Sequence, residues 1–270
     1  MGRVDSDQKN ALGNQVIRLA PEHHDIAQSF CVEIEQAWRR LHIRLIPGKF
    51  AIALLKEMSD VDEAGRSAFV AVMNDCKQRG AALHVTMNGI PTSHEDPRLW
   101  ETQWSRFQLE MSVNPIDIGS GDAKADRDLA KSWIARFITA VAALLPLEPA
   151  TDDASTFDGF PEGTVMTVKV NRYERDRRNR MAALAIHGWS CQTCGLRLSD
   201  VYGVSAGEVI HVHHTTPVSE IGPDYVINPE IDLIPLCPNC HAVVHSQEPM
   251  LQPDDVRNLI EETARKRSQP

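Results

Sequence analysis

Residues 209–245 read VIHVHHTTPVSEIGPDYVINPEIDLIPLCPNCHAVVH, and this stretch decides how the C-terminal half of the chain folds. It contains the pair Cys237-Pro-Asn-Cys240, and an earlier pair with the same spacing is Cys191-Gln-Thr-Cys194. A gap of two residues lets both sulfurs of a pair face one ion, so two pairs can complete a tetrahedral site. Four thiolates leave no open position, and the sequence therefore predicts a structural Zn²⁺. Four unrelated buried cysteines, or a redox pair, are the alternative.

Histidines make up a second group in the same stretch. His213 and His214 follow a short apolar segment, and His241 and His245 are four residues apart just after the second cysteine pair. If residues 239–247 are helical, this spacing puts both imidazoles on one face. Two helical histidines and one from a neighbouring strand would bind a metal with positions left for water and substrate, and the fourth histidine would be available as a base.

Two further expectations concern these histidines. His211 is expected to face away from the site. A purely structural role for the other four is the alternative to catalysis, although four cysteines would already saturate a structural zinc.

Taken together, these motifs resemble the HNH, or ββα-metal, nuclease motif. The resemblance rests on the cysteine pairs, on His213-His214 followed by Pro217, and on the run from Asp232 to His245. The flanking residues are similar to the McrA-like branch, which includes modified-cytosine-dependent restriction enzymes. The resemblance covers residues 160–262 and does not extend to residues 1–150.

The resemblance implies roles for individual residues. His214 falls where the family has its general base, and His213, His241 and His245 fall where it has ligands of a catalytic divalent ion, with Mg²⁺, Mn²⁺ and Ni²⁺ as candidates. At the middle position, where the family has an Asn that orients the loop and the base, this chain has Asp232. Asn228, just upstream, is the alternative for that role.

The implied function is a DNA endonuclease that hydrolyses phosphodiester bonds with one metal ion, of a restriction or defence type acting on foreign or modified DNA. A non-catalytic zinc-ribbon module that binds nucleic acid is the alternative. The expected partner is double-stranded DNA, although the formal net charge is -9. A local excess of basic residues between positions 169 and 180 offers guanidinium groups for phosphates, and the predicted DNA contacts are Arg172, Arg175, Arg177, Arg178 and Arg180. A solvated helix face is the alternative for this cluster.

The length of 270 residues favours two domains, and the elements predicted along the chain favour an α+β fold. Residues 1–150 form an α+β domain of no recognised family, with target recognition or regulation as its expected role. Residues 151–164 have the composition of a linker, being rich in Pro, Gly, Asp, Ser and Thr. Residues 165–270 form the HNH domain with its four-cysteine zinc site.

Periodicity predicts the elements of this fold. Residues 1–20 are expected to be a polar lead-in, and Trp100 and Trp104 lie in a long loop where they could stack a base, although aromatic residues at such spacing more often belong to a core. The predicted helices span 22–41, 59–79, 126–145 and 171–188, with a last one from Pro253, and the predicted strands span 41–46, 83–87 and 107–113.

Nothing in the sequence predicts a membrane partner. The longest apolar run, Trp133–Leu147, is interrupted by Arg136 and is shorter than the roughly 20 residues that a membrane-spanning helix needs. The N-terminus has no apolar signal core, and six cysteines without an export signal argue for metal binding rather than disulfides. These features predict a cytoplasmic protein, and they leave open whether it forms a homodimer.

Overall fold

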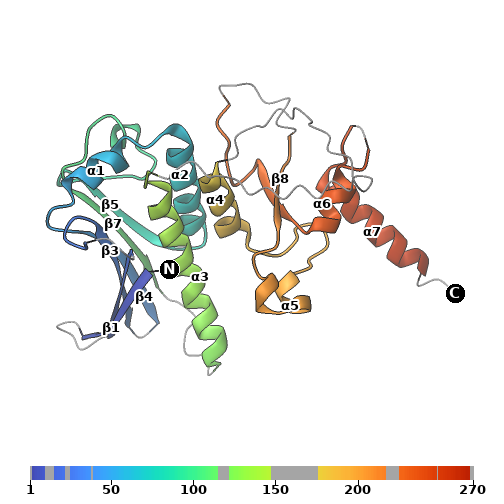
Figure 1. The fold of residues 1–270 in the computed structure, drawn as a ribbon, viewed down its shortest axis with the longest axis horizontal. Coiled ribbons are helices and arrows are strands. Elements are labelled where there is room, and N and C mark those ends of the chain that lie inside the picture. Colours follow the sequence, from blue (N-terminus) through green and yellow to red (C-terminus); the bar gives the residue numbers. More distant parts are fainter. Residues whose placement is uncertain are drawn as a thin grey trace, which may run out of the picture.

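The computed structural model describes residues 2–9, 15–21, 25–37, 39–114, 122–146, 176–216, 225–247 and 249–267. These residues form a mixed α+β fold, as the sequence predicted, with an N-terminal part built on a sheet and a smaller C-terminal part that contains the metal-ligand motifs (Figure 1). The predicted linker, residues 151–164, lies outside the described residues.

A seven-stranded antiparallel sheet is the base of the N-terminal part. Its strand order is β1-β2-β3-β4-β7-β5-β6. The alternation predicted for the residues after Leu41 and after Phe107 is confirmed, since apolar side chains from both segments line the helix-covered face of the sheet. The strands are β1 (Gly2–Lys9), β2 (Gln15–Pro21), β3 (Phe30–Ala37), β4 (Arg40–Pro47), β5 (Ala82–Met87), β6 (Ile90–Thr92) and β7 (Phe107–Val113).

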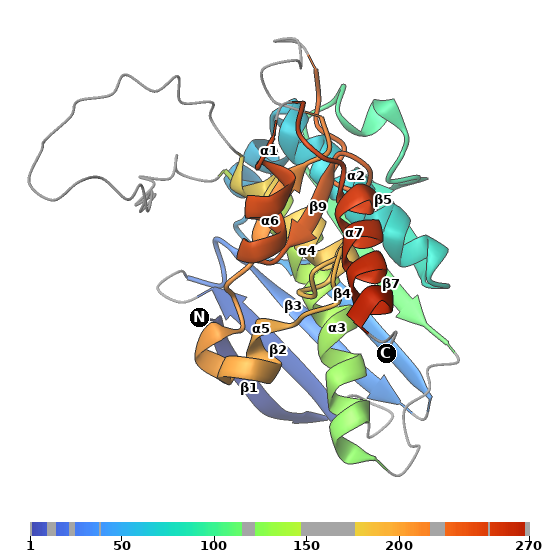
Figure 2. The ribbon, with the colours of Figure 1, turned by 90° about the vertical axis from the view of Figure 1, so that its right-hand side faces the viewer.

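Helices cover one face of this sheet (Figures 1 and 2). They are α1 (Ile52–Ser59), α2 (Glu63–Gln78) and α3 (Ala123–Ala143), and a short 3₁₀ helix, η1 (Pro97–Leu99), follows β6. Phe69 from α2 and Phe137 from α3 are completely buried in the shared core. The caps explain where the long helices begin, because Asp62 accepts a hydrogen bond from the Gly65 N–H and Asp122 accepts from the N–H groups of residues 124 and 125.

Two predictions for the N-terminal part are wrong. Residues 30–37 form strand β3 rather than part of a helix over 22–41, and residues 2–9 and 15–21 form strands rather than a lead-in. Apolar residues three and four apart also occur in β3, so this spacing does not distinguish a helix from a strand here. The buried Glu33 favours the strand. Its carboxylate accepts hydrogen bonds from Arg18 on β2 and Arg44 on β4, and these partners reach it only across a sheet.

The tryptophans of the 88–106 loop belong to the core. Trp104 is fully buried, its indole N–H donates to the Leu99 carbonyl at 2.7 Å, and its ring stacks on Phe107 with centroids 4.0 Å apart. Trp100 packs edge-on against Phe69. Trp104 is therefore a core residue, and Trp100 is partly buried against the same core.

Helix α4 (Arg177–His187) joins the two parts of the chain (Figure 1). It packs against α2 and α3, and Ala182 and Ile186 lie in the same apolar cluster as the N-terminal core. Asp176 caps it by accepting from the Arg178 N–H, so this helix begins later than the predicted start after Asn171, which lies outside the described residues.

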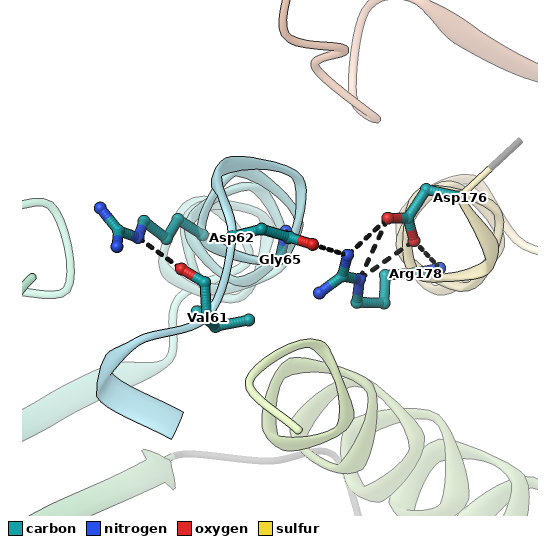
Figure 3. Close-up of polar contacts among 6 residues, drawn as sticks. Val61, Asp62, Gly65, Asp176 and Arg178 are labelled. Atoms are coloured by element: carbon teal, nitrogen blue, oxygen red, sulfur yellow. Dashed lines mark hydrogen bonds and ion pairs between the residues drawn. The ribbon is translucent and has the colours of Figure 1, made fainter. Parts of the chain in front are cut away.

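An ion-pair cluster reinforces this junction (Figure 3). The guanidinium of Arg178 binds Asp176 at 2.6 Å and Asp62, the cap of α2, at 2.5 Å, and the Arg178 side chain is only 9% exposed. Burial would raise the pKa of Asp62, but the hydrogen bonds from Arg178 and the Gly65 N–H outweigh it and lower that pKa. Residue 65 has to be a glycine, because a Cβ there would lie 2.6 Å from the Ala143 carbonyl oxygen and 2.8 Å from the Arg178 guanidinium.

The C-terminal part has the element order ββα at its centre. Strands β8 (His211–His214) and β9 (Leu233–Leu236) pair antiparallel, and α6 (Pro238–Val244) follows directly. Helix α5 (Leu198–Tyr202) and the 3₁₀ helix η2 (Val204–Ala206) precede the strands, and α7 (Pro253–Arg267) closes the described chain. The helix expected over residues 239–247 is present as α6, although it ends at Val244 and His245 is its C-cap. The prediction of a last helix from Pro253 is confirmed. None of the described helices has both the length and the apolar character needed to cross a membrane.

Candidate metal centre

The four cysteines of the two pairs come together in the C-terminal part. One sulfur from each of Cys191, Cys194, Cys237 and Cys240 lies within 4.8 Å of the others, and the Sγ atoms of Cys194 and Cys237 are 3.8 Å apart. Four sulfurs at about 2.3 Å from a central zinc would lie about 3.8 Å from one another, so the arrangement fits a tetrahedral Zn²⁺ site. Three of the four cysteines are buried, which suits an ion that is closed off from substrate.

The backbone shapes each cysteine pair as a ligand loop. In the first pair, Gly195 has a φ of 73°, and its N–H donates to the Cys191 carbonyl at 2.8 Å. In the second pair, Cys237 is the N-cap of α6, and its sulfur accepts from the Cys240 N–H at 3.5 Å. The Gln192 N–H donates to the Pro235 carbonyl of β9 at 2.9 Å and holds the first loop against the second.

The electrostatic surroundings favour a thiolate at Cys191. Burial would raise the pKa of this thiol, but backbone N–H groups around it outweigh that effect and lower the pKa to about 7. A thiolate is the form that binds zinc, so the lowered pKa of Cys191 suits a zinc ligand. Burial and the neighbouring cysteines raise the pKa of Cys194 and Cys240, so the case for zinc at those two residues rests on the convergence of the four sulfurs.

The histidines form a second, separate group. One ring nitrogen from each of His213, His241 and His245 lies within 4.8 Å of the others. The ring centroids of His213 lie 5.5 Å from His241 and 5.0 Å from His245, and the two helix rings are 4.7 Å apart. His213 is 2% exposed while His245 is exposed, so the group is buried at one end and open to solvent at the other. Three nitrogen donors with an open side fit a metal ion that keeps positions for water and substrate.

Strand alternation decides which histidines of β8 join this group. His213 and His214 point to opposite faces because successive side chains of a strand do so. His214 is half-buried, pairs across the strands with Leu233, and is not among the three residues that converge. The alternation of β8 thus places His213 in the histidine group and turns His214 away from it.

His211 contradicts the expectation that it faces away. Its ring stacks on His241 with centroids 4.7 Å apart and an interplanar angle of 18°. The signal was present in the sequence, because residues 211 and 213 are two apart in a strand and so share a face. His211 is exposed, and it adds a fourth imidazole beside the group of three.

Asp232 organises the loop before β9. Its carboxylate accepts hydrogen bonds from the Tyr225 hydroxyl at 3.0 Å and from the Asn228 N–H at 2.7 Å, and its main-chain carbonyl accepts from the Thr215 N–H at 2.9 Å. Thr215 directly follows His214, so residue 232 links the loop to the strand end that carries this histidine. The side chain of the alternative residue, Asn228, caps the Glu230 N–H within the same loop.

This loop is also anchored to the N-terminal part. The Ser67 hydroxyl on α2 donates to the Ile227 carbonyl at 2.9 Å, and Gln78 on the same helix lies 3.4 Å from the Glu230 carboxylate. Sequence reasoning did not predict these contacts, because they join residues more than 150 positions apart.

The five arginines predicted to bind DNA lie in different surroundings. Arg172 and Arg175 are outside the described residues, and Arg177 is exposed at the start of α4. Arg180 is half-buried and donates to the Ile210 carbonyl at 3.0 Å, just before β8. Arg178 is buried and its charge is compensated by Asp62 and Asp176, so it is unavailable to a phosphate.

Comparison with known protein families gives a match in the segment that contains the cysteine and histidine groups. Residues 191–247 match the family model described as HNH endonuclease. This segment is an HNH endonuclease domain. The matched residues begin at the first cysteine ligand and end two residues after His245, so the HNH domain includes both the cysteine group and the histidine group. The match names no branch within the family, and searches of curated proteins and of solved structures found no match to this chain.

Proposed function

We propose that this chain is a DNA endonuclease whose HNH domain hydrolyses phosphodiester bonds at the histidine group. The observation that carries the proposal is the convergence of His213, His241 and His245 on one point, open to solvent, in a domain where four cysteines already provide a closed site. A structural module would need only the closed site. The second, open site is the arrangement that hydrolysis requires.

In this proposal His213, His241 and His245 bind one divalent ion, which supplies positive charge to polarise the scissile phosphate and stabilise the leaving oxygen. The donor set is entirely imidazole, which suits Ni²⁺ better than Mg²⁺, because Mg²⁺ prefers oxygen ligands. Of the three candidate ions, Ni²⁺ therefore matches these residues best.

His214 acts as the general base in this proposal. An imidazole can take a proton from the attacking water near neutral pH. Because His214 is the last residue of β8 and faces away from His213, this role places the bound phosphate at the end of the strand, between the two histidines. Asp232 is a positioning residue, because its carboxylate is occupied by Tyr225 and the Asn228 N–H while its carbonyl fixes the residue after His214.

We further propose that double-stranded DNA is the substrate and that the exposed Arg177, with Arg172 and Arg175, contacts its phosphates, while Arg180 mainly fixes the start of β8. Residues 1–150 would select the target or control activity, residues 151–164 would be a linker, and the HNH domain would span 165–270. A restriction or defence role against foreign or modified DNA, of the McrA-like type, agrees with this division of labour.

A plasmid-cleavage assay with added Mg²⁺, Mn²⁺ or Ni²⁺ tests the proposal. We expect the wild type to nick or linearise the plasmid and His214→Ala to lose on the order of 10²–10⁴-fold in rate, since a general base typically contributes that much. Zinc content and the circular dichroism spectrum should not change. Equal cleavage by wild type and variant would remove His214 as the base. A wild type that binds DNA but cleaves none with any of the ions would favour the zinc-ribbon binding module.

A further inference from the structure

A cavity of about 480 Å³ opens in the N-terminal part, at the end of the sheet next to α1. In Figure 1 this end lies on the opposite side of the molecule from α6, which contains His241 and is followed directly by His245. The volume falls within the range of small-molecule sites. The histidine group thus does not account for the cavity.

The cavity exists because two neighbouring strands separate. Strands β4 and β7 pair only from Leu41 opposite Val113 to Arg44 opposite Glu110. Beyond that point β4 continues to Pro47 and β7 begins at Phe107, yet the described residues show no further pairing between them. Side chains from α1 and β7, Leu55 and Phe107 among them, form an apolar wall in the gap.

The charged residues that line the cavity are both cations, Lys49 and Arg106, and no carboxylate is among the described lining residues. Two other arginines in this part of the chain, Arg44 and Arg136, are neutralised by Glu33 and Asp75. Lys49 and Arg106 are both exposed at the rim of the cavity and have no ion pair with another described residue, and the Lys49 ammonium lies 5.5 Å from the centroid of the Phe50 ring. Two cations on one cavity, neither paired with a carboxylate of the described residues, favour an anionic ligand.

The backbone on both sides of the cavity is held in place. On one side, the N–H groups of Gly48 and Phe50 donate to the carbonyls of Ser29 and Ala27, which fixes Lys49 between them. Gly48 allows this close approach, because a Cβ there would lie 2.1 Å from the Ile26 carbonyl oxygen.

On the other side, the Asn88 side chain binds the chain before β7. Its amide oxygen accepts from the N–H groups of Ser105 and Arg106 at 2.8 and 3.1 Å, and its amide nitrogen donates to the Gln103 carbonyl at 3.2 Å. Both cations therefore extend from fixed backbone, which lowers the entropy lost when a ligand binds.

We propose that this cavity binds a nucleotide. Lys49 and Arg106 take the phosphate, the wall formed by Ile52, Leu55 and Phe107 contacts the base, and Thr86, Ser105 and Gln108 offer hydroxyl and amide groups to the sugar and the base edge. The nucleotide comes either from solution or from a DNA strand in which one nucleotide is unstacked. The choice of ligand rests on the proposed function, whereas the anionic character of the site does not.

Isothermal titration of the full-length protein tests the proposal. The four deoxynucleoside 5′-monophosphates, inorganic phosphate, a 20-nucleotide single strand and the matching duplex are titrated separately into the wild type and into Lys49→Gln/Arg106→Gln. Lys56→Gln is the matched control, because it removes a cation from exposed α1 surface outside the cavity. We expect at least one monophosphate or the strand to bind, and the double variant to weaken that binding tenfold or more while the control leaves it unchanged.

Monophosphate binding lost in the double variant identifies a free nucleotide, and loss of strand binding alone identifies a nucleotide within DNA. Equal affinities in all three proteins, binding of phosphate only, or no binding of any probe would overturn the proposal. No cleavage is needed for this measurement. An inactive protein that binds nucleotides here would therefore refute the nuclease and not the cavity, and an active nuclease with no cavity-dependent binding would do the reverse.

Discussion

The two apolar cores of this protein differ in size and in what completes them. The N-terminal core joins side chains from the sheet, from α1, α2 and α3, and from α4. Among the described residues, the C-terminal core has six buried members, and three of them are cysteines. A core that small buries too little apolar surface to offset the entropy of ordering its chain, so it depends on a bound ion. The large N-terminal core buries enough apolar surface to fold without a bound ion. Because α4 is part of that core, the HNH domain packs against the N-terminal part through this helix.

Replacing a zinc ligand should have the largest effect, because it should unfold the C-terminal part and leave the N-terminal part folded. We expect Cys240→Ser to lose the structural zinc and unfold the C-terminal part, because structural zinc contributes on the order of 10 kcal/mol to folding of small domains. The N-terminal part should stay folded. Zinc content and limited proteolysis with mass mapping check this, and a variant that keeps its zinc and protects residues 191–247 would contradict the structural site.

Replacing His241, the residue after Cys240, tests whether the histidine group is independent of the zinc site. We expect His241→Ala to keep zinc content and thermal stability close to wild type but to lose plasmid cleavage by about a hundredfold or more, since a catalytic ion supplies several kcal/mol of stabilisation to the transition state. His84→Ala, which removes an exposed imidazole from β5, is the control and should cleave normally. Loss of zinc from His241→Ala would mean that the two groups are not independent.

Acid should weaken the N-terminal core through Glu33. Burial would raise the pKa of this carboxyl, but Arg44 and Arg18 outweigh it and lower the pKa below the ordinary 4.5. A carboxyl with a lowered pKa stabilises the folded state above its unfolded pKa, and that contribution disappears as the pH falls through the folded value.

Glu33→Gln should therefore cost about 1.5–3 kcal/mol at neutral pH, the range for hydrogen bonds to charged groups, and the difference from wild type should shrink below about pH 4. Thermal unfolding from pH 3 to 7, with zinc content as a second readout, checks this. A stability difference that is independent of pH would rule out the ionised carboxylate as the cause.

The smallest expected effect lies where the two parts meet. Ser67→Ala removes the hydrogen bond from α2 to the Ile227 carbonyl and should cost about 1 kcal/mol locally. We expect faster hydrogen exchange in residues 225–232 and a several-fold lower kcat with an unchanged KM for DNA, and Ser67→Thr should restore both. Ser132→Ala is the control, because its hydroxyl donates to the Leu129 carbonyl within α3 and touches no part of the loop. Equal exchange in both alanine variants would show that α2 does not hold the loop.

Local patterns predicted the parts of this fold that depend on neighbours in sequence. Helices α2, α3 and α7 and the pairs of cysteines followed from periodicity, caps and spacing. Strand β3 did not, because its apolar spacing also suits a helix and Glu33 finds its arginines only on neighbouring strands. Arg178 was predicted to contact DNA although Asp176, one of its two carboxylate partners, lies only two residues away; the other partner, Asp62, lies 116 residues earlier and could not be predicted from local sequence.

The candidate site, like the fold, was predicted from the sequence only in part. The group of His213, His241 and His245 followed from a strand next to a helical spacing of four, and the three rings do converge. His211 was misplaced although the two-residue period of a strand puts it on the same face as His213. The anchoring of the 225–232 loop by α2 had no signal in the sequence.

Metal content and plasmid cleavage, measured together on one preparation after dialysis against a weak chelator, test the account most directly. We predict that one zinc per chain remains, that cleavage is lost, and that adding a divalent ion such as Ni²⁺ or Mn²⁺ restores cleavage without changing the zinc content. Full cleavage with one zinc per chain and no added ion, or zinc and folding lost together with the exchangeable ion, would contradict the division into a closed cysteine site and an open histidine site.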